Sequence, residues 1–132
     1  MPRVTNFTDL VGDGGVLIGD DGVLEYIRDF NTSTYATNGG NACLMLMAQG
    51  LTEPGSSAEV LVNDIPVGFI HSSHADARPD RVSQIINVGT EVLNAGDNRL
   101  RIKAAVLSGG GSGNEHDDFE VSDVMLFYQV DV

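Results

Sequence analysis

The sequence predicts an all-β domain, folded as an antiparallel sandwich or barrel. The chain contains 16 glycines, many of them next to Asp or Asn, which is typical of tight turns. These turns separate about eight short segments of high β-propensity, at the spacing expected of sandwiches and barrels. No segment has the sustained 3.6-residue apolar period that would indicate a helix. A length of 132 residues fits a single domain, 1–132.

The expected strands follow one another between these turns. They cover residues 16–18, 23–27, 42–49, 59–63, 67–71, 82–88, 98–107 and 119–132. The polar stretch 31–41 is expected to form a long loop. Residues 83–93 have room for one helical turn, but Ile85, Ile86, Val88 and Val92 favour a strand. The Gly- and Ser-rich segment 108–114 lies between two strong strands, so we expect a loop there rather than a linker between domains.

Two segments indicate a more specific architecture. Residues 58–68 read as a strand, an Asx-type turn and a returning strand. Residues 93–102 contain the turn Gly96-Asp97-Asn98, followed by a strand with Leu100 and Ile102 on one face. A closing strand, 121–130, completes the set. Over roughly residues 58–130 this order resembles galactose-binding-like and carbohydrate-binding-module jelly rolls. The resemblance implies an antiparallel two-sheet β-sandwich of jelly-roll type. The sequence departs from the pattern at Asp64, where glycine is usual.

The charge balance is strongly acidic. Nineteen acidic residues oppose seven basic ones, which gives a net charge of −12, and Lys103 is the only lysine. An acidic, lysine-poor surface is typical of proteins in molar salt, where ions screen the repulsion between carboxylates. We therefore predict a halophilic protein, with an ordinary acidic protein as the alternative. The same charge argues against binding to nucleic acid. No apolar run approaches the ~20 residues of a membrane span, so we expect no membrane insertion.

Several segments contain His and Asp residues of the types that bind metal ions. His71, His74 and Asp76 lie within six residues, and His116 lies among acidic residues. Zinc also requires a fourth ligand position and a rigid frame, so we interpret both segments as polar loops. Asp13-Gly14 and Asp20-Asp21-Gly22 lack the ligand spacing of calcium loops and are typical of turns. The sequence therefore predicts no metal site and no cofactor.

No catalytic set is visible in the sequence. There is no Gly-x-Ser-x-Gly nucleophile motif and no phosphate-binding loop, so we predict a protein that is not an enzyme. Cys43 is the only cysteine and lies in an apolar run, which favours an inert thiol. Sugar-binding sandwiches generally stack sugar rings on aromatic side chains, but the chain has no tryptophan. Tyr35, in a polar loop, is the one tyrosine expected to serve as a ligand platform.

Two expected strands are apolar on both faces. Leu44 and Leu46 share one face of residues 42–48, and Val124, Leu126, Tyr128 and Val130 share one face of the closing strand. The opposite faces carry further apolar side chains, namely Cys43, Met45, Met47, Met125 and Phe127. A loop, formed by residues 1–15 or 29–41, is one way to cover them. The alternative is a subunit interface, where methionines and aromatic residues are enriched.

Three basic residues form a stripe on another strand. Arg99, Arg101 and Lys103 alternate with apolar residues and therefore share one face. Either they pair with acids on neighbouring strands, such as Glu120 or Asp123, or they dock an acidic subunit.

The sequence as a whole favours a structural role. We expect a homo-oligomeric virion component of a virus of halophilic archaea, such as a capsid decoration, turret or tail protein, together with other subunits of an assembly. The alternative is a carbohydrate-binding module, or another ligand-binding sandwich of a halophile, with a glycan partner. The expected location is the virion, or else the exterior or cytoplasm of a halophilic archaeal cell.

Overall fold

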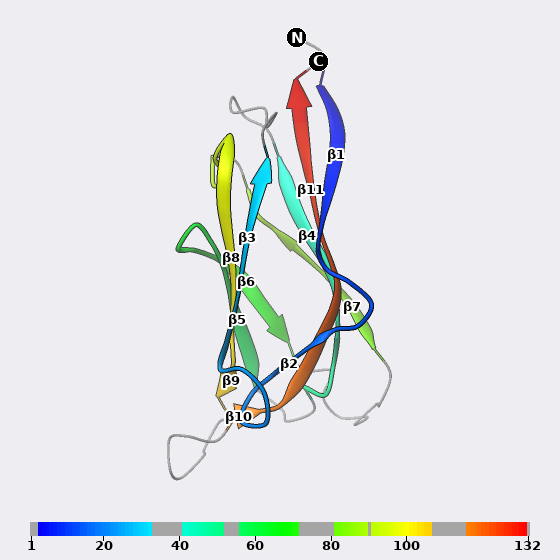
Figure 1. Cartoon of the computed structure of the whole chain (residues 1–132), viewed down its shortest axis with the longest axis vertical. Coiled ribbons are helices and arrows are strands. Elements are labelled where there is room, and N and C mark those ends of the chain that lie inside the picture. Colours follow the sequence, from blue (N-terminus) through cyan, green and yellow to red (C-terminus); the bar gives the residue numbers. More distant parts are fainter. Residues whose placement is uncertain are drawn as a thin grey trace.

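The computed structural model describes residues 3–32, 41–51, 56–71, 81–89, 91–106 and 116–131. These residues form eleven β-strands and, within those ranges, no helix (Figure 1). The strands are β1 (Arg3–Val11), β2 (Val16–Ile18), β3 (Glu25–Thr32), β4 (Ala42–Gln49), β5 (Ser57–Val62), β6 (Ile65–His71), β7 (Val82–Asn87), β8 (Gly96–Lys103), β9 (Ala105–Val106), β10 (His116–Asp117) and β11 (Phe119–Asp131).

The strands form two main antiparallel sheets. Sheet A has the order β1-β11-β4-β7, and β2 pairs with the first residues of β11. Sheet B has the order β3-β8-β5-β6. A short ribbon of β9 and β10 lies where the chain leaves sheet B and enters β11. The predicted antiparallel two-sheet sandwich is confirmed, with eleven strands in place of about eight. Strands β1 and β10 were not expected, and the expected strand 98–107 is divided into β8 and β9.

The core lies between the two sheets. In β4 and β11 the predicted inward faces are confirmed, since Leu44, Leu46, Val124 and Leu126 are fully buried. They pack against a second set of fully buried side chains, which sheet B supplies and which includes Val60, Val62, Ile70, Leu100 and Ile102. Because side chains alternate between faces along a strand, this burial also fixes which residues face outward on each sheet.

The first segment of the chain differs from the expectation. Residues 3–11 do not drape over sheet A as a loop but form its edge strand, β1, with Phe7 opposite Phe127. The sequence pattern predicts this strand poorly, because β1 lies at the edge of the sheet and most of its residues are exposed. It therefore contains few buried apolar residues. The register shifts at a bulge between Asp9 and Val11.

Strand β3 also runs further than expected. It pairs with β8 up to Thr32 opposite Gly96, rather than ending near Asp29. Residues 31 and 32 of the expected loop therefore belong to β3, and residues 33–40, including Tyr35, lie outside the described part of the chain.

The β5–β6 hairpin turns through two residues with left-handed backbone conformation. Asn63 has φ 52° and Asp64 has φ 64°, the pattern of a type I′ turn. Asn and Asp tolerate this conformation better than other non-glycine residues because their short side chains form local hydrogen bonds. This explains how Asp64 replaces the usual glycine without loss of the hairpin.

Candidate functional site

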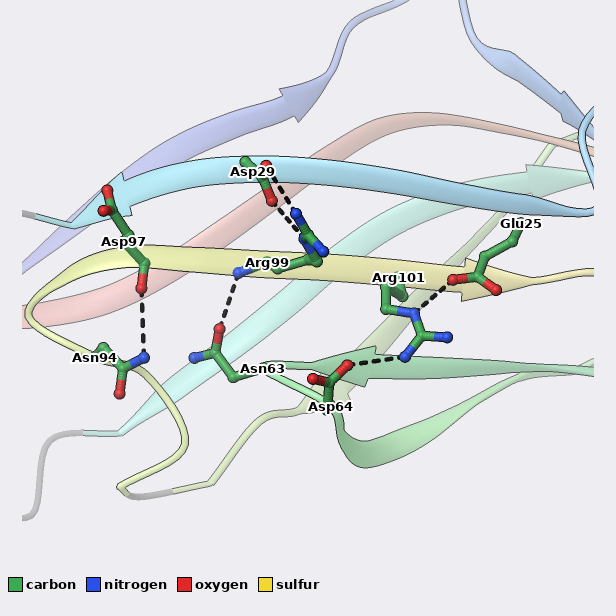
Figure 2. Close-up of polar contacts among 8 residues, drawn as sticks. All are labelled: Glu25, Asp29, Asn63, Asp64, Asn94, Asp97, Arg99 and Arg101. Carbon is green, nitrogen blue, oxygen red and sulfur yellow. Dashed lines mark hydrogen bonds and ion pairs between the residues drawn. The ribbon is translucent and has the colours of Figure 1, made fainter.

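A hollow of the described surface lies on sheet B. It has a volume of about 600 Å³ and is lined by Asp29, Phe30, Asn31, Asn63, Asp97, Asn98 and Arg99. Three elements supply these residues, namely the end of β3, the start of β8 and the β5–β6 turn (Figure 2). The lining is mainly polar, and we call this feature the sheet B hollow.

An exposed ion pair forms one side of the sheet B hollow. Arg99 Nε donates to Asp29 Oδ1 at 2.7 Å, and Arg99 Nη2 donates to Asp29 Oδ2 at 3.2 Å. Hydrogen bonds from Arg99 hold the pKa of the Asp29 carboxyl below its usual value. The side chains remain 52% and 67% exposed, so both groups stay accessible to a ligand. The paired geometry fixes two planar polar groups side by side on the surface.

A second polar pair lies further along the same two strands. Asn31 Nδ2 donates to Asp97 Oδ1 at 3.1 Å, and both residues are exposed. The backbone carbonyl of Asp97 accepts a hydrogen bond from Asn94 Nδ2 at 3.3 Å (Figure 2). The rim of the hollow therefore presents amide and carboxylate groups in fixed positions.

Buried amides support the hollow from below. Asn98 is 4% exposed, and its Nδ2 donates to Thr32 Oγ1 and to the carbonyls of Asn94 and Gly96 at 2.9–3.0 Å. Asn98 Oδ1 accepts from Asn63 Nδ2 at 2.8 Å and from Asn94 N at 2.7 Å. The sequence pattern marks Gly96-Asp97-Asn98 as a turn, but it does not reveal this network, because Thr32 and Asn63 lie far from Asn98 in the chain.

The basic stripe of β8 continues away from the hollow. Arg101 bonds Glu25 Oε1 at 2.5 Å and Asp64 Oδ1 at 2.8 Å, while Lys103 lies 3.3 Å from Glu59. The hydrogen bond from Arg101 lowers the pKa of Glu25. Cross-strand pairing is thus present, and docking of a subunit on this stripe stays a prediction.

The predicted pairing of that stripe with Glu120 or Asp123 is wrong. Glu120 and Asp123 belong to sheet A, where they pair with Arg81 at 3.1 and 3.7 Å. The stripe lies on sheet B, so residues of β11 cannot reach its outer face.

The apolar side chains predicted as an interface are brought together on sheet A. Cys43, Met45, Met47, Met125 and Phe127 point outward and are half-buried. The sequence did not identify two further members, Phe7 and Ile85, which are 54% and 72% exposed. Both lie on edge strands, and their membership depends on the pairing of Phe7 with Phe127 and of Ile85 with Met45.

The histidine and aspartate segments take structural positions. The Asp20 carboxylate accepts a hydrogen bond from His116 N at 3.0 Å and lies 2.7 Å from His116 Nδ1, which lowers the pKa of Asp20. Gly22 N donates to the carbonyl of Gly19 at 3.2 Å, so Asp20-Asp21-Gly22 forms a turn, as predicted. Asp118 Oδ1 accepts a hydrogen bond from Asp20 N at 2.6 Å. Hydrogen bonding to Asp118 raises the pKa of Asp21.

The remaining expected sites are only partly placed. His71 ends β6 beside the ring of Phe69, whereas His74 and Asp76 lie outside the described residues. Within the described ranges, no three His, Cys, Asp or Glu side chains are grouped so as to hold a metal ion. In the same part of the chain, no helix has the length and apolarity needed to cross a membrane.

Comparisons with known proteins identify the fold. No protein-family model matches the sequence, and no curated protein matches it significantly. Among solved structures, BuGH86 in complex with neoagarooctaose matches with a TM-score of 0.57 and 16% identity, over 97% of this chain and 19% of that one. Dimeric latent PorU from Porphyromonas gingivalis matches with a TM-score of 0.57 and 9% identity, over 99% of this chain and 13% of that one.

A smaller protein matches along nearly its whole length. A family 35 carbohydrate-binding module from an environmental isolate has a TM-score of 0.51 and 12% identity, over 95% of this chain and 90% of the module. The chain thus spans less than a fifth of the two larger proteins and most of the module. At these identities the similarity shows a shared β-sandwich fold.

Proposed function

We propose that the chain is a non-catalytic glycan-binding domain that uses the sheet B hollow. The similarity in fold to a carbohydrate-binding module of nearly equal extent supports this proposal. The same fold also occurs as a small part of BuGH86, whose structure contains neoagarooctaose. Both comparisons favour the glycan-binding alternative over a virion component.

The exposed Asp29–Arg99 pair carries the proposal. Sugar hydroxyls both donate and accept hydrogen bonds, so they match a carboxylate and a guanidinium held side by side. Asn31 and Asp97 extend the same chemistry along the rim. Because the buried Asn98 network fixes the turn that precedes Arg99, these groups need little ordering when a ligand binds.

The ionisation of Asp29 argues against a role for this carboxyl as the acid of a glycoside hydrolase. A hydrolase requires one carboxyl that is protonated near neutral pH, which means a raised pKa. Arg99 instead lowers the pKa of Asp29, so this carboxylate is ionised and suited to accept hydrogen bonds.

Titration calorimetry tests the proposal with neoagarooctaose, cellohexaose and xylohexaose as ligands. We expect one of them to bind, and Arg99→Ala to weaken the affinity about tenfold or more, as for loss of charge-assisted hydrogen bonds. Arg81→Ala, which breaks an exposed ion pair on sheet A, is the matched control and should bind normally. Absence of binding by all three sugars, or normal binding by Arg99→Ala, would contradict the proposal.

Assembly is the second candidate function, and it rests on the outer face of sheet A. Exposed Ile85 on β7 lies opposite half-buried Met45 on β4, which lies opposite Met125 on β11, so these residues form an apolar row across three strands. Exposed Phe7 lies opposite Phe127 in the neighbouring row. A subunit of a halophilic virion would use such a row to contact its neighbours. Light scattering in molar salt should then report an oligomer that Met125→Asp combined with Ile85→Asp converts to a folded monomer. A monomeric parent protein would exclude assembly through this face.

A further inference from the structure

We infer that sheet A carries a second, separate sugar-binding site, which takes one uncharged pyranose ring. The site is a hollow of about 230 Å³ on the outer face, which we call the sheet A hollow. Its lining residues are Thr5, Asn41, Ala42, Cys43, Asn87, Phe127, Tyr128 and Gln129. The inference rests on the proposed glycan-binding function but assigns a different surface to it.

The pairing register explains how this hollow forms. Phe127, Cys43 and Asn87 lie opposite one another on β11, β4 and β7, so they form one row of outward side chains. Thr5 and Gln129 are paired in the next row, on β1 and β11. Ala42 and Tyr128 point into the core, and their strands therefore supply the floor between the two rows.

The lining combines an aromatic ring with polar amides. Phe127 forms an apolar wall, and a pyranose ring has an apolar C–H face that packs against such rings. Asn87 Oδ1 accepts a hydrogen bond from Gly89 N at 3.0 Å, and Gln129 Oε1 accepts from Asn41 N at 3.2 Å. These bonds orient both amides.

The two oriented amides leave donors for a ligand. Among the described residues, the side-chain nitrogens of Asn87 and Gln129 have no hydrogen-bond partner. Each of these NH2 groups offers two donors, which suits the ring and hydroxyl oxygens of a sugar.

Charge and size narrow the ligand class. No lining residue of the sheet A hollow is charged, whereas the sheet B hollow contains Asp29, Asp97 and Arg99. The chain carries a net charge of −12, which disfavours anionic sugars at a site without cations. The volume lies below the ~300–1,000 Å³ of pockets for drug-sized ligands, so the hollow suits one ring of a longer glycan.

The only cysteine of the sequence gives a direct readout of occupancy. Cys43 lines the sheet A hollow and is partly exposed. The experiment measures the rate of Cys43 alkylation by iodoacetamide, with and without neoagarooctaose, cellohexaose or xylohexaose. At a sugar concentration about ten times the dissociation constant, mass action leaves about a tenth of the sites open, so we expect about tenfold slower alkylation. High salt should not reduce this protection.

Variants separate the two sites. Asn87→Ala combined with Gln129→Ala should abolish the protection, and circular dichroism should show an unchanged fold because both side chains point outward. Arg81 directly precedes β7 and does not line the hollow, so Cys43 should remain protected in Arg81→Ala. If no sugar protects Cys43 while calorimetry detects binding that Arg99→Ala removes, the second site is wrong and the sheet B proposal stands.

Two other outcomes are equally decisive. Protection of Cys43 that persists in Arg99→Ala, with no other sugar binding lost, supports the sheet A site and removes the sheet B proposal. Protection that rises with protein concentration in the absence of sugar assigns this face to a second copy of the chain. That result overturns the inference.

Discussion

Asn98 shows how one buried side chain shapes the surface above it. It both donates and accepts hydrogen bonds within the polar network under the sheet B hollow. Its partner Thr32 lies on β3, far from Asn98 along the chain, whereas its partner Asn94 belongs to the turn that precedes β8. Removing the amide would leave buried polar groups without partners, which costs more than the hydrogen bonds themselves contribute.

We therefore predict that Asn98→Ala lowers the free energy of unfolding by about 2–4 kcal/mol, since each unsatisfied buried group costs about 1–3 kcal/mol. Asn6→Ala is the matched control, because Asn6 is exposed and makes one local hydrogen bond. It should change stability by less than about 0.5 kcal/mol. Urea denaturation measures both values, and equal effects of the two substitutions would contradict the role assigned to Asn98.

Glu25 provides a prediction about pH. Its pKa is lowered in the folded protein because Arg101 donates a hydrogen bond to it. A lowered folded-state pKa means that ionised Glu25 stabilises the fold above its unfolded pKa, and that this contribution is lost as the pH falls. The melting temperature of Glu25→Gln should therefore lie a few degrees below that of the parent at pH 7.

The same difference should disappear in acid. It should decline between about pH 5 and pH 2, where Glu25 becomes protonated in both states. Asp13→Asn, in an exposed turn, serves as the control for a general change of charge. A difference between Glu25→Gln and the parent that persists unchanged at pH 2 would show that packing, rather than the ion pair, is responsible.

At the scale of elements, the β5–β6 hairpin combines a strained turn with an ion pair. Asp64 adopts φ 64°, which favours glycine, but its carboxylate bonds Arg101. Its side chain is 77% exposed, so the ion pair contributes little. We therefore predict that Asp64→Gly raises the melting temperature slightly. A lower melting temperature would show that the ion pair outweighs the backbone strain.

The elements also show what the sequence can predict. Strands β4, β5, β8 and β11 were found because each buries a regular apolar face. Strand β1 was missed because an edge strand with mostly exposed residues lacks that pattern. The two hollows depend on the register between neighbouring strands. This register places Asp29 opposite Arg99, and it places Phe127, Cys43 and Asn87 in one row. The spacing of residues along one strand does not reveal which residues of the adjacent strands lie beside them.

At the scale of the whole molecule, electrostatic repulsion sets the conditions for stability. The net charge is −12, and Arg99, Arg101 and Arg81 already have acidic partners in Asp29, Glu25 and Glu120. We predict that the melting temperature falls when salt is lowered from about 1 M to about 0.1 M, where the Debye length grows from about 3 to about 10 Å. Calorimetric scans across this range measure the melting temperature. A melting temperature that stays constant or rises as the salt concentration is lowered would refute the halophilic interpretation.

The pairing of β1 with β11 determines how the domain would respond to a pulling force. Arg3 lies opposite Asp131, so both ends of the described chain lie at the same end of sheet A (Figure 1). Antiparallel hydrogen bonds run perpendicular to the strands. Tension applied at the two ends would therefore load these bonds one at a time and peel β1 from β11, starting at Arg3. The domain should unzip at low force, with β1 detaching before β11 leaves β4, while the sheet B hollow is still intact.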